Sequence, residues 1–149
     1  MSPKLKSNQA APKVQQNATA CPAEQYPQLS FRYMTTNSAH SLKYLEKLKN
    51  AERIKTLDGL FQRFEELTKM SWERLMLLKK TEGCETLTWN RIKFRGTNAS
   101  TEEGKALVFR FDTWQGNGKG RIIGFKDSPC SAFFIVGFDF DFTAYDHDT

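Results

Sequence analysis

Two arginines lie in a part of the chain whose other residues favour β-strands. Arg110 stands between Phe109 and Phe111, and Arg121 begins the apolar run that follows the glycine-rich residues 115–120. A hairpin would bring Arg110 and Arg121 onto neighbouring strands. Each guanidinium presents a planar fork of donors that matches a phosphate group. The pair predicts a phosphate site, and ion pairs with the acidic C-terminal residues are the alternative that stays open.

The C-terminal residues alternate aromatic and acidic side chains. Asp139 and Asp141 would share one face of an extended segment, and Asp146 and Asp148 follow them. Together with His147, these oxygen ligands could hold a divalent metal ion, as in a metal-dependent nuclease. Because no spacing among them is diagnostic of a metal site, we predict neither a metal nor another cofactor.

Two histidines and a tyrosine are the candidate proton carriers. His147 lies two positions after Tyr145, and His40 is the only other histidine. In RNA cleavage one group takes the proton of the 2′-hydroxyl while another protonates the leaving oxygen, and a histidine suits either role. The nucleophile elbow, the Walker motif, the dinucleotide-binding glycine pattern and the HExxH motif are all absent from the sequence, which argues against those enzyme classes.

Charge is distributed unevenly along the 149 residues. Residues 1–95 carry 17 Lys and Arg against 9 Asp and Glu, whereas residues 96–149 carry 5 against 8. A basic surface favours a polyanionic partner through counterion release, and ordinary solvated helix faces explain the same charges equally well. The three cysteines show no metal-binding spacing, and no apolar run is long enough to cross a bilayer. We therefore predict a cytoplasmic protein with reduced thiols and no membrane partner.

These chemical groups need a scaffold, and the sequence predicts one α+β domain over residues 29–149 behind a disordered arm at 1–28. We expect, in chain order, a strand at 29–34, helices over 41–70 and after the N-cap Ser71, and strands at 86–94 (with an irregularity near Asn90), 106–111, 121–125 and 133–138. The last of these is nearly continuous in apolar residues, so it should be buried on both faces. The N-terminal strand and helices should pack on one face of a three- to five-stranded antiparallel sheet, with the other face partly open.

The strand block resembles the toxins of the RelE/ParE/HigB superfamily, and the similarity covers residues 29–149. Val108–Phe111 resembles their strand that ends in an arginine, Gly120–Phe125 resembles the strand that follows it, and Phe134–Phe138 resembles their last hydrophobic strand. Tyr145 and His147 fall where the family keeps its terminal catalytic side chain.

This resemblance implies an mRNA endoribonuclease, commonly ribosome-dependent, that an antitoxin neutralises. Arg110 and Arg121 would bind the scissile phosphate, while Tyr145 or His147 would assist proton transfer. Further contacts with nucleic acid are expected from Lys93, Arg95, Lys119 and Lys126.

A second hypothesis is a non-enzymatic accessory protein of a phage or mobile element, which inhibits a protein target or binds nucleic acid. It would use the open sheet face and the acidic C-terminus, where negative charge would repel RNA but could mimic nucleic acid.

Overall fold

The computed structural model describes residues 26–79, 82–97, 104–126 and 132–146. The predicted arm lies outside these ranges except for its last three residues. In chain order the described elements are β1 (Gln28–Ser30), η4 (Ser38–His40), η5 (Leu42–Lys47), α1 (Asn50–Lys69), α2 (Trp72–Leu77), β2 (Glu85–Thr88), η6 (Trp89–Arg91), β3 (Lys105–Thr113), β4 (Gly116–Lys126) and β5 (Ala132–Asp139), where η marks a 3-10 helix.

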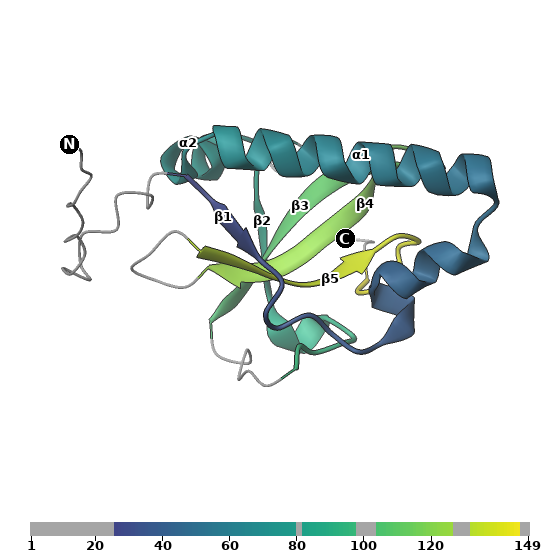
Figure 1. The fold of residues 1–149 in the computed structure, drawn as a ribbon. Helices are drawn as coiled ribbons and strands as arrows, with labels where there is room; N and C mark the ends of the chain where they lie inside the picture. The colour runs from purple at the N-terminus through teal and green to yellow at the C-terminus, as the bar shows by residue number, and fades with distance from the viewer. Residues whose placement is uncertain (1–25, 80–81, 98–103, 127–131, 147–149) are drawn as a thin grey trace, which may run out of the picture.

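The strands form one sheet in the order β1-β5-β4-β3-β2. Strands β2 to β5 are antiparallel neighbours, whereas β1 runs parallel to β5 and pairs Gln28 with Ala132. Figure 1 shows α1 and α2 on the same side of this sheet. The predicted α+β class is confirmed, and the sheet is mixed because β1 joins it in the parallel direction.

The face that α1 and α2 cover holds the first of two apolar cores. Leu60, Phe64 and Leu67 recur at helical spacing on α1, so one stripe of the helix faces the sheet, and Trp72 and Leu75 of α2 extend it. The strands contribute Leu107, Phe109, Phe111, Ile122, Phe133, Ile135 and Phe138. Burying one such side chain contributes about 1.5–3 kcal/mol, so this core anchors the helices. No helix in the described ranges is both long and apolar enough to cross a membrane.

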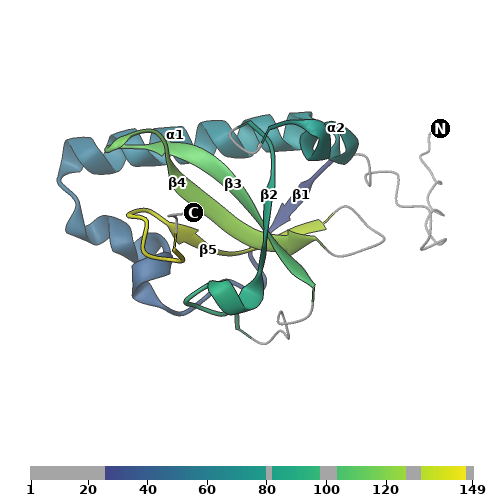
Figure 2. The ribbon, with the colours of Figure 1, turned by 180° about the vertical axis from the view of Figure 1, so that it is seen from behind.

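A second apolar core covers the other face, which we expected to be partly open. Residues 89–94, predicted as part of a strand, instead form η6 and a loop on the side of the sheet away from α1 (Figures 1 and 2). This core therefore covers part of the face that we expected to be partly open. The residues of this core are Leu87, Trp89, Ile92, Phe94, Ala106, Val108, Ile123, Val136, Ala144 and Tyr145. Strand β5 contributes to both cores, as its apolar run predicted.

The helical region predicted over 41–70 is interrupted before α1. Leu48 has an extended backbone, and the guanidinium of Arg53 donates hydrogen bonds of 3.0 Å to the carbonyls of Leu45 and Leu48. Leu45 O also accepts the N–H of Leu48 at 3.1 Å, so Arg53 adds a second donor to it and supplies one to Leu48, which ties the end of η5 to the start of α1. The predicted N-cap of the next helix is confirmed, since Ser71 Oγ accepts a hydrogen bond from the backbone N–H three residues later.

The β3–β4 hairpin turns earlier than predicted. We expected residues 115–120 to connect the strands, but Gly116 already pairs with Thr113, and the chain turns between these two residues. Gly116 and Gly118 have φ angles of 140° and 68°, which glycine adopts without a steric penalty. The N–H of Gly118 donates to the carboxylate of Asp112 at 2.7 Å. This bond holds the irregular start of β4 against β3.

Candidate functional site

A row of charged residues crosses the centre of the sheet on the face away from α1. Arg110 of β3 is the Cα partner of Arg121 of β4, and Arg121 is the Cα partner of Asp139 of β5. Arg110 shares its face with Val108, because side chains alternate along a strand and Val108 packs in the second core. The predicted proximity of the two arginines is confirmed.

Arg121 is buried, with 4% of its surface exposed. One terminal nitrogen, Nη1, donates to the carbonyl of Gly118 at 2.8 Å and to the carbonyl of Gly120 at 3.1 Å. The ring of Phe142 lies 4.8 Å from the central carbon of the guanidinium, in a cation–π contact. Arg121 therefore supplies positive charge from inside the protein, while backbone groups and an aromatic ring fix its position.

Tyr145 and Glu85 extend the row. The hydroxyl of Tyr145 donates to Glu85 Oε1 at 3.5 Å. Burial raises the pKa of Tyr145 above its ordinary value, and the charge of Glu85 raises it further, while the charge of Arg121 and a hydrogen bond with it oppose this shift. The phenol therefore stays protonated at neutral pH. Since Glu85 is the Cα partner of Val108, it is a diagonal neighbour of Arg110, within reach of long side chains.

Arg110 differs from Arg121 in having no partner for its charge. It is half-buried, and its Nε–H, like that of Arg121, is buried without a hydrogen-bond acceptor. Within the ranges that the structure describes, no hydrogen bond or ion pair involves its guanidinium. A partly desolvated cation beside a second arginine attracts an anion more strongly than one in bulk water does. Arg110 is therefore the group of this row that is best suited to bind a ligand.

The acidic residues after β5 are held by one threonine. Strand β5 ends at Asp139, which is fully buried and accepts a hydrogen bond from the N–H of Thr143 at 2.9 Å. Asp141 accepts one from the hydroxyl of Thr143 at 2.6 Å. The segment is thus a loop, because β5 pairs only as far as Asp139 and Phe142 between these groups takes a φ of 65°. The two carboxylates do not line an extended face as predicted.

No metal site forms in the described part of the chain, where no three His, Cys, Asp or Glu side chains gather closely enough to hold an ion. His147 and Asp148 lie outside the described residues, so the predicted role of His147 stays a prediction. His40, the other candidate proton carrier, is buried. Its ring stacks on Phe94 at 4.5 Å, and its Nδ1 lies 3.0 Å from the carbonyl of Phe138. This packing separates His40 from the charged row.

The four basic residues predicted to contact nucleic acid have different surroundings. Lys119 lies 5.6 Å from the ring of Phe142 and so borders the charged row. Lys93 approaches the carboxylate of Asp146 at 4.0 Å, which partly offsets its charge. The other two are used elsewhere: Arg95 donates to the carbonyls of Ile92 and Phe94, and Lys126 lies over the ring of Trp72, which belongs to the first core.

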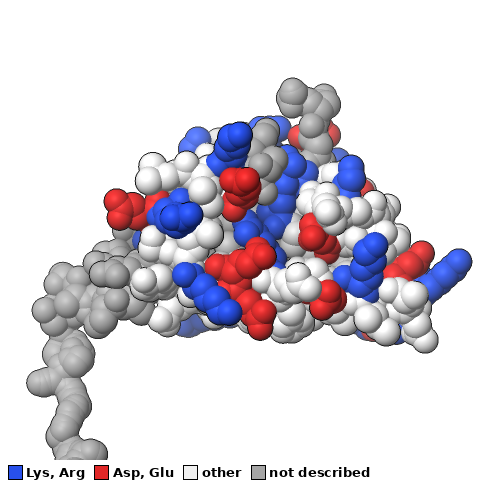
Figure 3. All heavy atoms as spheres, turned by 90° about the horizontal axis from the view of Figure 1, so that it is seen from above, with Lys and Arg blue, Asp and Glu red and all other residues white. Residues whose placement is uncertain are grey.

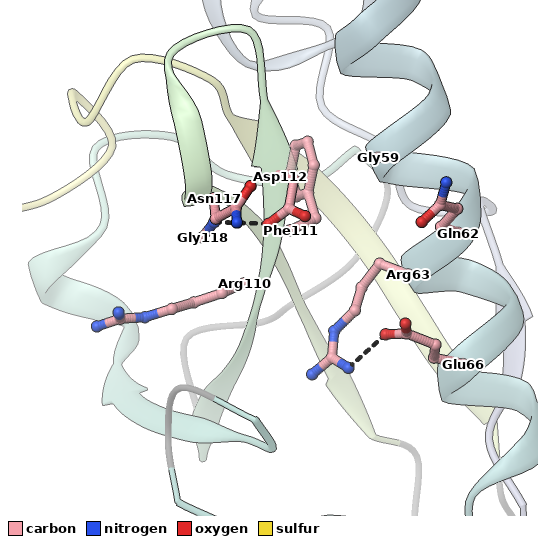
Figure 4. Close-up of a pocket in the computed structure, with 9 residues that line it drawn as sticks. All are labelled: Gly59, Gln62, Arg63, Glu66, Arg110, Phe111, Asp112, Asn117 and Gly118. Atoms are coloured by element: carbon pink, nitrogen blue, oxygen red, sulfur yellow. Dashed lines mark hydrogen bonds and ion pairs between the residues drawn. The ribbon is translucent and has the colours of Figure 1, made fainter.

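A cavity of about 360 Å³ lies between α1 and the β3–β4 hairpin (Figure 4). Its lining residues are Gly59, Gln62, Arg63, Glu66, Arg110, Phe111, Asp112, Asn117 and Gly118. Arg63 is already engaged, with Glu66 at 3.0 Å and with the carbonyl of Glu82 at 2.9 Å. In Figure 4 the guanidinium of Arg110 points away from α1, so the cavity contacts its stem and its charge lies elsewhere. We therefore place the candidate site at the charged row.

The surface on the α1 side carries no continuous patch of one charge sign in the view of Figure 3. Basic and acidic side chains alternate over this side of the molecule (Figure 3). A polyanion would find attraction and repulsion side by side here. The view therefore argues against a broad basic platform on the helix side.

Comparison of the chain with models of known protein families, with curated proteins and with solved structures finds no match in any of the three. The resemblance to RelE-like toxins therefore stays a prediction. The sequence named Arg110, Arg121 and Tyr145 as candidates, and the structure brings them together, but the sequence did not point to Glu85 or Phe142. Glu85 lies two positions before Leu87 on β2 and so shares its face, but the expected strand began at residue 86, and nothing local indicated which face Tyr145 would reach.

Proposed function

We propose that the charged row binds a phosphodiester of RNA and cleaves it by proton transfer. The observation that carries this proposal is Arg110, a half-buried guanidinium without a partner among the described residues, beside the buried charge of Arg121 and diagonal to the carboxylate of Glu85. A fixed cation next to a carboxylate supplies both an anion site and a proton acceptor. Tyr145 is 3% exposed and donates a hydrogen bond to Glu85, so it assists proton transfer by holding the carboxylate in position.

In the proposed reaction the ribose 2′-hydroxyl attacks the adjacent phosphorus, and the bond from phosphorus to the 5′-oxygen breaks. Glu85 takes the proton of the 2′-hydroxyl, and a solvent water gives a proton to the departing 5′-oxygen. The products are a 2′,3′-cyclic phosphate and a 5′-hydroxyl end. The proton on Glu85 then passes to the hydroxide that the water leaves, which restores the carboxylate, while Tyr145 holds Glu85 in place through its 3.5 Å hydrogen bond.

The two arginines have different roles in this proposal. Arg110 contacts the phosphate oxygens and stabilises the charge that develops on them, because its guanidinium is partly exposed. Arg121 has 4% of its surface exposed and donates to two backbone carbonyls. It therefore acts as a positioning residue, and its charge adds positive electrostatic potential at the site. This division alters the expectation that both arginines bind the phosphate directly.

RNA cleavage by purified protein tests the proposal. An mRNA, free and on translating ribosomes, is incubated with wild-type protein, and the new 5′ ends are mapped and tested for a 5′-hydroxyl. Arg110→Met should lower the cleavage rate by about 100-fold or more, the usual loss when one donor to a developing oxyanion is removed. Glu85→Gln should cause a loss of similar size, because an amide cannot accept the proton.

Arg74→Met is the matched control. Arg74 is an exposed arginine on α2, whose buried residues belong to the first core, so it lies away from the charged row. Its replacement removes one positive charge from the surface and should leave cleavage at the wild-type rate. No cleavage by wild-type protein in either condition, or equal losses for Arg110→Met and Arg74→Met, would refute the proposed reaction.

A protein-binding function is the second candidate, and exposed aromatic residues favour it. Phe61 of α1 is 59% exposed and Phe31 is 49% exposed, and both rings contact Phe64. Ile54, two helical turns before Phe61, is 67% exposed. Exposed apolar groups that adjoin one another are typical of interaction surfaces. This surface differs from the sheet face and acidic C-terminus that we expected, and loss of a co-purifying protein on Phe61→Asp would test it.

A further inference from the structure

Phe142 combines two features that packing alone does not require. Its φ of 65° lies in the left-handed region, and it is the single residue other than glycine with a positive φ in the described part of the chain. Its side chain is 37% exposed. A bulky residue in this conformation is unfavourable, and such strain is concentrated at functional sites. Glycine or asparagine would take the same turn with less strain.

Hydrogen bonds on both sides of Phe142 hold it in this position. The N–H of Thr143 donates to Asp139, and its hydroxyl donates to Asp141. The centre of the ring lies 4.8 Å from the guanidinium carbon of Arg121 and 5.6 Å from Nζ of Lys119. The loop therefore presents an aromatic ring at the edge of the charged row, and its orientation is fixed before any ligand arrives.

We infer that Phe142 is the surface on which a nucleobase of the bound RNA stacks, next to the phosphate at Arg110. This inference rests on the proposed function and adds the recognition of a base to it. Single-stranded RNA exposes its bases, and aromatic side chains bind them through their ring faces with little dependence on sequence. Lys119, whose Nζ lies 5.6 Å from the ring centre, would then be near the adjoining phosphate, where its charge adds affinity.

A structural role for Phe142 is the competing explanation, and a change of side chain separates the two. Phe142→Leu keeps an apolar side chain over Arg121 but removes the ring face. Phe142→Tyr keeps the ring. Both variants retain the backbone geometry that the threonine bonds impose, so both should unfold at temperatures close to that of the wild type.

The test measures the affinity of the full chain for two fluorescein-labelled probes. One probe is an oligouridine, and the other is an oligomer of the same length whose ribose phosphates carry no bases. We expect Phe142→Leu to weaken oligouridine binding by about 5-fold to 100-fold, the range of one stacked base, and to leave binding of the abasic oligomer unchanged. Phe142→Tyr should bind both probes as the wild type does.

Equal weakening of both probes by Phe142→Leu would overturn the inference, because it would mean that the ring acts only by supporting Arg121. Unchanged oligouridine binding would overturn it as well. Arg110→Met distinguishes this failure from failure of the proposed function, because it should weaken both probes equally. If Arg110→Met affects neither probe while Phe142→Leu selectively weakens oligouridine, stacking stands and the phosphate site at Arg110 is refuted.

Discussion

Replacing Arg110 with methionine should stabilise the protein while it lowers the rate of the proposed RNA cleavage by about 100-fold or more. Like charges directly opposite on paired strands cost about 0.2–1 kcal/mol, and Arg110 and Arg121 are such partners. A buried donor without an acceptor costs about 1–3 kcal/mol, and the Nε–H of Arg110 is one. Methionine removes both penalties and keeps the apolar stem, whose packing an alanine would lose.

Because Arg110 is only half-buried, solvent reduces both penalties. We expect the free energy of unfolding to rise by about 1 kcal/mol, which corresponds to about 2–4 °C in Tm for a chain of this size. Urea unfolding followed by tryptophan fluorescence measures the change, and an unchanged slope against urea would show that the denatured state is unaffected. Arg110→Lys is the matched variant, since it retains the charge and should gain less.

A fall of 1 kcal/mol or more in the free energy of unfolding of Arg110→Met would refute this reasoning. It would mean that the guanidinium has a stabilising partner in the folded protein and is not poised for a ligand. A substitution that stabilises the fold and lowers activity is expected where a site keeps an unpaired charge for its ligand.

Three further changes have definite expected outcomes. Arg121→Met should lower the free energy of unfolding by about 3 kcal/mol in a urea titration, because two carbonyls and the buried Asp139 lose the nearby cation. Burial raises the pKa of the Cys84 thiol from 9.0 to about 12, so stability should be full below pH 9 and decline as pH rises toward 12. Cys84→Ala should remove the fall in the free energy of unfolding that urea titrations detect between pH 9 and 10. A variant whose free energy of unfolding falls with pH as steeply as that of the wild type would contradict this prediction. Gly59→Ala should lower Tm, because a Cβ there would overlap the carbonyl of Asp112 and push α1 off β3, and an unchanged Tm would show that the helix can shift freely.

Local patterns in the sequence predicted the parts of the fold that depend on near neighbours. Alternation along the strand predicted that Arg110 points to the face away from Phe109 and Phe111. The hairpin predicted Arg121 as its neighbour on the next strand, and Ser71 predicted the start of α2. Each of these depends on contacts within one strand pair or one helical turn. They were predictable because the relevant geometry is set by residues close together in the chain.

The rest of the site depends on contacts between distant segments. Glu85 meets Tyr145 across 60 positions, and the pairing of β1 with β5 spans the domain. The turn of the β3–β4 hairpin was misplaced because Gly116 and Gly118 can continue a strand with positive φ, whereas an Asn-Gly pair more often marks the turn. The break of residues 89–94 from the sheet buries Trp89 and Ile92 in the second core, and no local pattern indicates that outcome.

The position of β5 determines when the molecule can finish folding. It is the last strand in the described part of the chain, yet it lies between β1 and β4, and its residue Ala132 pairs with Gln28, 104 positions earlier. Pairings of such long range form late and slowly. During synthesis, β1 has no strand neighbour until β5 leaves the ribosome, and Asp139 and Tyr145 emerge after Glu85, Arg110 and Arg121. A nascent chain therefore carries Arg110 before the charged row is assembled, which would delay the proposed action on RNA until β5 has paired.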